Sequence, residues 1–197
     1  MKHEAFTKLV AEMRTAEKRY WQGGRQHNDL TKAIYLESQV DKEIKRVADI
    51  LQSRPESQPG NESPQWKFFC LVTCLRSDTQ KYFALKKVLR YKSPQERAAS
   101  QGELNDLWTS VTHYEAEIDR MLNRISDAEK RALGYTITFQ VIRSRANMRE
   151  PQVMLTTQDE NYANAACYDY NNKSKDGSIY GVRRIEQQPQ QKEDTPK

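Results

Sequence analysis

Apolar residues recur at alternating intervals of three and four along four long stretches of this chain. This is the spacing of heptad a and d positions, which places an apolar stripe along one side of an α-helix. The four stripes comprise Phe6, Leu9, Met13, Ala16 and Tyr20; Leu30, Ala33, Glu37, Val40, Ile44, Val47 and Leu51; Phe68, Leu71, Leu75, Asp78, Tyr82, Leu85 and Leu89; and Leu104, Leu107, Val111, Tyr114, Ile118, Met121 and Ile125. Because each stripe must be buried against another helix, the spacing predicts a mainly α-helical fold.

Two charged residues, Glu37 and Asp78, stand at stripe positions. A charge there is costly unless it is paired. Inward carboxylates of four-helix bundles can bind two irons, but that site also uses Glu-x-x-His motifs, which this sequence lacks. We therefore expect these residues to set the helix register or to face solvent where the stripe widens.

Turn signals separate the four helices. Gly23-Gly24 breaks the chain between the first two stripes, which predicts an antiparallel helical hairpin. Ser63 before Pro64 is typical of a helix N-cap followed by proline at the first helical position. Ser93 and Glu96, with Pro94 between them, form a capping box that opens the segment between the third and fourth stripes.

The two hairpins resemble each other in sequence. FTKLVAEMRTAEKRYW (6–21) matches FFCLVTCLRSDTQKYF (68–83) at an offset of 62, and VDKEIKR (40–46) matches YEAEIDR (114–120) at an offset of 74. The second hairpin thus carries 12 extra residues in its turn. This order predicts a duplicated hairpin. The alternative is that amphipathic helices resemble one another through their periodicity alone.

The predicted organisation is two tandem antiparallel hairpins, residues 1–53 and 66–132, joined by a proline-rich linker at 54–65. The hairpins either face each other as a four-helix bundle or pair with a second chain in a coiled-coil-like manner.

Residues 133–185 change in character, and we expect a small β-rich or irregular region there. Alternating β-branched and aromatic residues predict a strand at 134–142 and a weaker one at 153–157. The segments 165–170 and 178–185 are expected to pair across a polar loop. The tail, 186–197, has no apolar residue and is predicted to be disordered.

Composition excludes several classes of function. The chain has 197 residues, a net charge of +5 and a pI of about 9.0. No apolar run approaches the roughly 20 residues that span a bilayer, and the first residues lack the apolar core of a secretory signal. We therefore expect a cytoplasmic protein without membrane contact. The odd cysteine count, with Cys70 and Cys74 inside a helical pattern, is consistent with this compartment.

No catalytic motif is evident. The three histidines, His3, His27 and His113, are scattered, and Cys70 and Cys74 share a helix face without further ligands, so no metal site is expected. Nucleophile elbows, phosphate loops and dinucleotide fingerprints are missing from the sequence. We expect no cofactor, and an enzyme is the weakest hypothesis.

A basic surface is the best binding signal. Residues 80–97, QKYFALKKVLRYKSPQER, carry six cations that we call the basic surface: Lys81, Lys86, Lys87, Arg90, Lys92 and Arg97. Tyr82, Phe83 and Tyr91 are interleaved with them. Such cations bind phosphates and such aromatics stack on bases, although a basic helix is more often simply solvated.

Aromatic pairs end the first arm of each hairpin, as Tyr20-Trp21 and Tyr82-Phe83. They either cap the bundle end or serve as exposed anchors for a partner. The leading hypothesis is a non-enzymatic helical interaction or scaffold protein that acts through protein–protein contacts or self-association. The alternative is a nucleic-acid-binding accessory protein that uses the basic surface.

Overall fold

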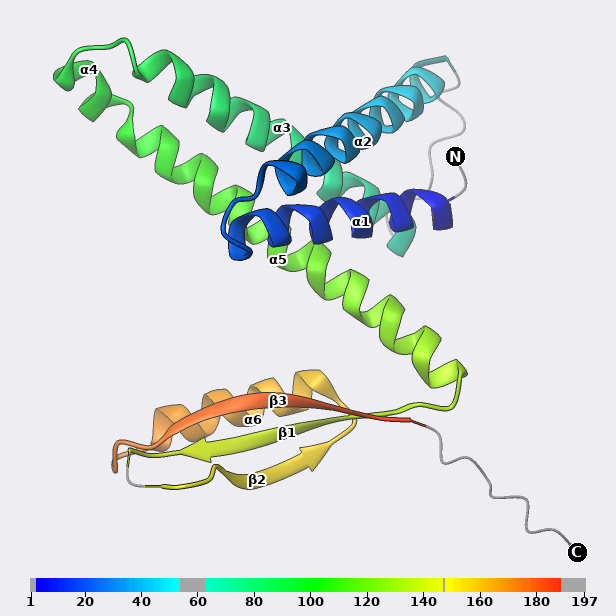
Figure 1. Cartoon of the computed structure of the whole chain (residues 1–197), viewed down its shortest axis with the longest axis vertical. Coiled ribbons are helices and arrows are strands. Elements are labelled where there is room, and N and C mark those ends of the chain that lie inside the picture. The colour runs from blue at the N-terminus through cyan, green and yellow to red at the C-terminus, as the bar shows by residue number, and fades with distance from the viewer. Residues whose placement is uncertain (1–2, 54–62, 147, 189–197) are drawn as a thin grey trace, which may run out of the picture. The chain divides into compact units, whose positions relative to one another are not determined.

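A computed structural model describes residues 3–53, 63–146 and 148–188. Its contacts divide the chain into two compact units, Met1–Arg124 and Ile125–Lys197. Figure 1 shows the elements of both, and each unit is described by itself. The linker residues 54–62 and most of the expected tail, 189–197, lie outside the described residues.

The first unit is helical, as the stripes predict. Its elements are α1 (His3–Gln22), α2 (His27–Ser53), α3 (Pro64–Leu89), α4 (Pro94–Ala99) and α5 (Gln101–Ala132), of which the last continues into the second unit. The short helix α4 occupies the segment that lengthens the second predicted turn. The starts of α2 and α5 lie 74 residues apart, which is the offset of the sequence match.

The predicted helix boundaries are confirmed by local geometry. Ser63 accepts a hydrogen bond from the backbone nitrogen of Trp66 at 3.1 Å and caps α3. Ser93 and Glu96 form the expected capping box at the start of α4. Between α1 and α2, a side chain at Gly23 would place its Cβ 2.6 Å from the carbonyl oxygen of Arg19, so this tight turn requires glycine.

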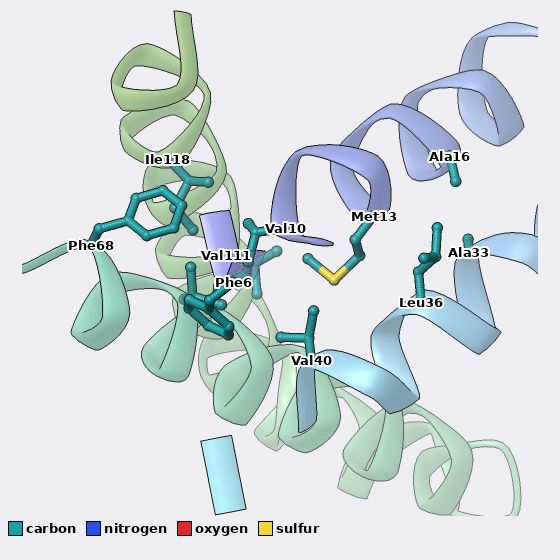
Figure 2. Packing of buried hydrophobic residues seen from close by; sticks show 12 residues of the cluster. Phe6, Val10, Met13, Ala16, Ala33, Leu36, Val40, Phe68, Val111 and Ile118 are labelled. Carbon is teal, nitrogen blue, oxygen red and sulfur yellow. The ribbon is translucent and has the colours of Figure 1, made fainter. Parts of the chain in front are cut away.

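One buried apolar cluster draws on α1, α2, α3 and α5 (Figure 2). Its members are Phe6, Val10, Met13, Ala16, Ala33, Leu36, Val40, Phe68, Val72, Leu75, Val111 and Ile118. Most of them are stripe residues, so the heptad spacing identifies the buried faces correctly. Ile125 is the exception among the large stripe residues, because it is exposed beyond the end of the cluster.

The second unit is a three-stranded antiparallel sheet with a helix packed on it. Strand β1 (Thr136–Ser144) lies between β2 (Gln152–Thr157) and β3 (Ile179–Gln187), and α6 (Glu160–Lys173) follows β2 (Figure 1). Ile137, Phe139 and Val141 of β1 alternate inward, as predicted, and pack against Ala163 of α6.

The prediction that 165–170 is a strand is wrong, because this segment belongs to α6. Asp159 accepts hydrogen bonds from the backbone nitrogens of Asn161 and Tyr162 and so starts a helix. The segment 178–185 does form a strand, but it pairs with β1. That strand continues to Gln187, so the predicted start of the tail at residue 186 is too early.

We predict that Phe68→Ala destabilises the first unit by about 3–5 kcal/mol, the usual cost of truncating a buried phenylalanine. Phe68 belongs to the cluster, and only 1% of its surface is exposed. The measurement is urea denaturation followed by tryptophan fluorescence, since the three tryptophans, Trp21, Trp66 and Trp108, all lie in this unit.

Phe83→Ala is the matched control for this variant. Phe83 lies in the same helix but is half exposed, and its truncation should change stability by no more than about 0.5 kcal/mol. Equal losses in the two variants would contradict the assignment of the core.

Candidate functional site

Two buried arginines occupy equivalent places in the matching sequence stretches. Arg14 and Arg76 lie 62 residues apart, and only 5% and 7% of their surfaces are exposed. A guanidinium taken out of water is costly unless acids surround it. The stability of the helical unit therefore depends on what these side chains contact.

Arg14 of α1 binds carboxylates of α1 and α5. Its Nε donates to Oδ1 of Asp119 at 3.2 Å, and its Nη1 donates to Oε2 of Glu17 at 2.5 Å and to Oε1 of Glu115. Lys18 also contacts Asp119 at 2.9 Å. The cluster joins the first helix to the last long helix of the unit.

Arg76 of α3 binds carboxylates of α2. Its Nε and Nη2 donate to the two oxygens of Asp41 at 2.8 and 3.0 Å, and its Nη1 lies 2.8 Å from Oε2 of Glu37. Glu37 is thus a paired residue, which explains how the second stripe carries a charge. Asp78, the other charged stripe residue, is half-buried and pairs with Lys81 at 3.2 Å.

The two clusters correspond to each other through the sequence offsets. Asp41 and Glu115, which bind Arg76 and Arg14, lie 74 residues apart at matching positions of the second arms. Each arginine reaches a helix of the other sequence half. Apolar spacing does not identify either arginine, although the Arg shared by the two matching stretches is a visible signal in the sequence.

Burial and neighbouring charges shift two of these groups. Burial raises the pKa of Glu17 to about 7; Arg14 opposes this rise, while Glu37 and Glu115 add to it. Burial also disfavours the charged form of Arg14, but the hydrogen bond with Asp119 and the nearby acids outweigh it and raise the pKa of Arg14. The guanidinium therefore stays charged, while Glu17 titrates near neutral pH.

A cavity of about 290 Å³ opens beside the clusters. Its lining consists of Glu17, Tyr20, Trp21, Leu30, Ala33, Ile34, Glu37, Leu75, Thr79, Phe83, Trp108, Val111 and Glu115. Four large apolar side chains of this lining, Trp21, Ile34, Phe83 and Trp108, are each 47–56% exposed, and we call them the rim. The rim residues correspond in pairs through the sequence offsets: Trp21 with Phe83 at 62 residues and Ile34 with Trp108 at 74 residues.

The aromatic pairs at the ends of the first arms are partly buried and partly exposed. Tyr20 contacts Trp21 and Tyr82 contacts Phe83, with ring centroids 5.1 and 5.3 Å apart. The tyrosine of each pair is half-buried, while Trp21 and Phe83 reach the rim. The pairs are therefore only partly packed, and whether they anchor a partner stays a prediction.

The basic surface is partly neutralised. Lys81 pairs with Asp78, Lys92 pairs with Glu96 at 3.0 Å, and Lys86 lies 5.2 Å from the ring centre of Tyr82. The remaining members, Lys87, Arg90 and Arg97, are exposed and pair with no acid of the described segments. Tyr91, beside Arg90, is 84% exposed.

Other chemistry is not evident in the described residues. They contain no group of three or more His, Cys, Asp or Glu side chains placed to hold a metal ion. All three cysteines are free, and burial raises the pKa of Cys70. Within the same residues, none of the helices has both the length and the apolar character needed to cross a bilayer.

Comparison with known proteins gives no further guidance: no family model, curated protein or solved structure matches this chain.

We predict that Arg76→Met destabilises the first unit by about 3–5 kcal/mol, because Glu37 and Asp41 are left near a buried site without their counter-ion. Arg14→Met should have an effect of the same order. The measurement is the urea midpoint of tryptophan fluorescence.

Arg120→Met is the control for the arginine variants, since Arg120 forms an exposed i,i+3 pair with Glu117. Exposed pairs contribute little to stability, so its midpoint should equal that of the wild type. A wild-type midpoint for Arg76→Met would mean that apolar packing alone holds the helices.

Proposed function

We propose that this protein is a non-enzymatic interaction protein built from two copies of one helical hairpin, α1–α2 and α3–α5, which close on each other as a four-helix bundle. The buried pairs Phe6 and Phe68, and Val10 and Val72, stand at the offset of 62 and support this view. Shared periodicity accounts for such apolar positions, but it does not account for buried arginines at matching positions.

The feature that favours duplication is the exchange of partners between the sequence halves. Arg14 and Arg76 are both buried, and each binds carboxylates of the other half's second arm. Heptad periodicity selects apolar residues and gives no reason for a buried arginine at the same place twice. The arrangement is that expected when two like hairpins bind reciprocally, as in a two-fold homodimer.

The rim is the surface that carries the proposed function. Trp21, Ile34, Phe83 and Trp108 are large, half exposed and gathered around one cavity. Large aromatic side chains in or around pockets are the anchors that dominate protein–protein binding energies. We infer that a protein partner, or a second copy of the chain, docks on this rim.

The test is affinity capture by the tagged full chain from an extract of its own cells, with mass spectrometry of the bound proteins. Trp108→Ser combined with Phe83→Ser should lose a partner that the wild type retains, since hot-spot truncations cost about 2 kcal/mol or more each. Light scattering of the purified chain checks whether that partner is a second copy.

Tyr35→Ser combined with Tyr91→Ser is the control for capture. Both tyrosines are more exposed than the rim residues, and neither lines the cavity. The control variant should capture the same partner as the wild type. Identical captures by the wild type and the rim variant would refute the rim as the contact surface.

A second candidate function, nucleic-acid binding, is favoured by the unpaired cations of the basic surface. Lys87, Arg90 and Arg97 are exposed beside the exposed ring of Tyr91. Cations of this kind engage phosphates, and a free aromatic ring stacks on unpaired bases.

For this second function we predict salt-dependent binding of a single-stranded oligonucleotide, measured by fluorescence anisotropy. Neutralising Lys87, Arg90 and Arg97 to glutamine should lower the slope of log affinity against log salt by about 0.7 per lost phosphate contact. Lys92→Gln, which removes a cation already paired with Glu96, should change the slope less. No binding at low salt would end this hypothesis.

A further inference from the structure

The charged residues that line the cavity are all acids. Glu17, Glu37 and Glu115 contribute to its wall, and no lysine or arginine of the described chain does so. We propose that the cavity binds the ammonium group of a lysine side chain presented by the protein partner, with Glu17 as its counter-ion. This inference rests on the proposed docking at the rim and specifies what the partner inserts there.

The charge around the cavity favours a cation. The ion pairs of Arg14 and Arg76 involve five carboxylates, those of Glu17, Glu37, Asp41, Glu115 and Asp119, and Lys18 is the one further cation that joins them among the described residues. The acids therefore exceed the cations by two. An inserted cation would reduce this excess of negative charge, whereas an anion would increase it.

Each of the three acids in the lining has one carboxylate oxygen without a hydrogen-bond partner among the described residues, and Glu17, with 14% of its side chain exposed, is the most buried of them. Its Oε2 accepts from Arg14, and its Oε1 has no hydrogen-bond partner within the described residues. A primary ammonium has three donors, and the hydroxyl of Thr79 is another acceptor in the lining. An ammonium group thus finds an acceptor that the protein itself leaves unused.

The walls of the cavity match the stem of a lysine side chain. Tyr20, Trp21, Phe83 and Trp108 supply aromatic surface, which packs against methylene groups and attracts a nearby cation. The guanidinium of Arg25 already lies 5.3 Å from the ring centre of Trp21. At about 290 Å³ the cavity is at the small end of ligand sites, which suits one side chain better than a large cofactor.

The proposed binding is coupled to a proton. Burial raises the pKa of Glu17 to about 7, so a proton and the ammonium compete for the same carboxylate at neutral pH. The charged groups facing it are Arg14 of α1, Glu37 of α2 and Glu115 of α5, while α3 contributes the neutral Thr79. A lysine ammonium stays protonated up to about pH 9. Affinity should therefore rise between pH 6 and pH 8 as Glu17 loses its proton.

The experiment titrates the full chain with N-acetyl-lysine methylamide and follows the three indole N–H signals by NMR. Those of Trp21 and Trp108, at the rim, should shift, while that of Trp66, which does not line the cavity, should stay. N-acetyl-norleucine methylamide, which has a similar apolar stem and no ammonium, should bind at least about tenfold more weakly, because it cannot make a charge-assisted hydrogen bond. Equal binding of the two amides would overturn the inference.

Glu17→Gln should weaken binding of the lysine amide about tenfold and remove its rise between pH 6 and pH 8, since the competing proton is gone. Glu12→Gln, an exposed acid of the same helix outside the cavity lining, should change neither. Unchanged affinity and pH dependence in Glu17→Gln would also overturn the inference.

Butylamine tests whether the ammonium comes from a partner's lysine or from a free amine. Much tighter binding of this free amine than of the lysine amide would contradict a partner's lysine.

Failure of this inference is distinguishable from failure of the proposed function. If Glu17→Gln captures the partner as well as the wild type does, while the rim variant loses it, docking stands and lysine insertion is refuted. If the rim variant also retains the partner, the proposed contact surface itself is refuted.

Discussion

Burial of two guanidinium groups is the constraint on which the helical unit depends. Removing such an ion from water costs several kcal/mol, so Arg14 and Arg76 are stable only where carboxylates meet them. The apolar stripes alone would allow helices to slide by a heptad. Fixed hydrogen bonds from Arg14 to α5 and from Arg76 to α2 permit one register, and that register places the rim side chains around a common cavity.

The helices of the first unit could be predicted because apolar residues recur at helical spacing over long stretches. The segment 165–170 was predicted wrongly because its apolar pattern is short. Ala163, Ala166, Cys167 and Tyr170 pack on the sheet at helical spacing, but a run of only a few apolar residues does not separate helix from strand. Only the cap at Asp159 marks the helix start, and a single aspartate in a polar region is a weak signal.

Of the two candidate sites, one could be predicted from the sequence and the other could not. The basic surface could be predicted, since its cations follow one another along the chain, but which of them are neutralised depends on side-chain placement. The cavity could not be predicted, because its lining comes from four helices and from residues up to 98 positions apart, Glu17 and Glu115. The aromatic pairs and the charged stripe residue Glu37 were noted in the sequence, but nothing there indicated that they share a cavity.

Under the proposed duplication, the cavity walls are related by the two sequence offsets yet differ in chemistry. Glu17 corresponds to Thr79 and Glu37 corresponds to Val111, so these two acids of the first half have neutral counterparts in the second. A perfectly two-fold cavity would accept an asymmetric guest in two equivalent orientations. Under the proposed duplication, divergence of the halves would make these orientations unequal, and the proposed guest would then enter the cavity in a single direction.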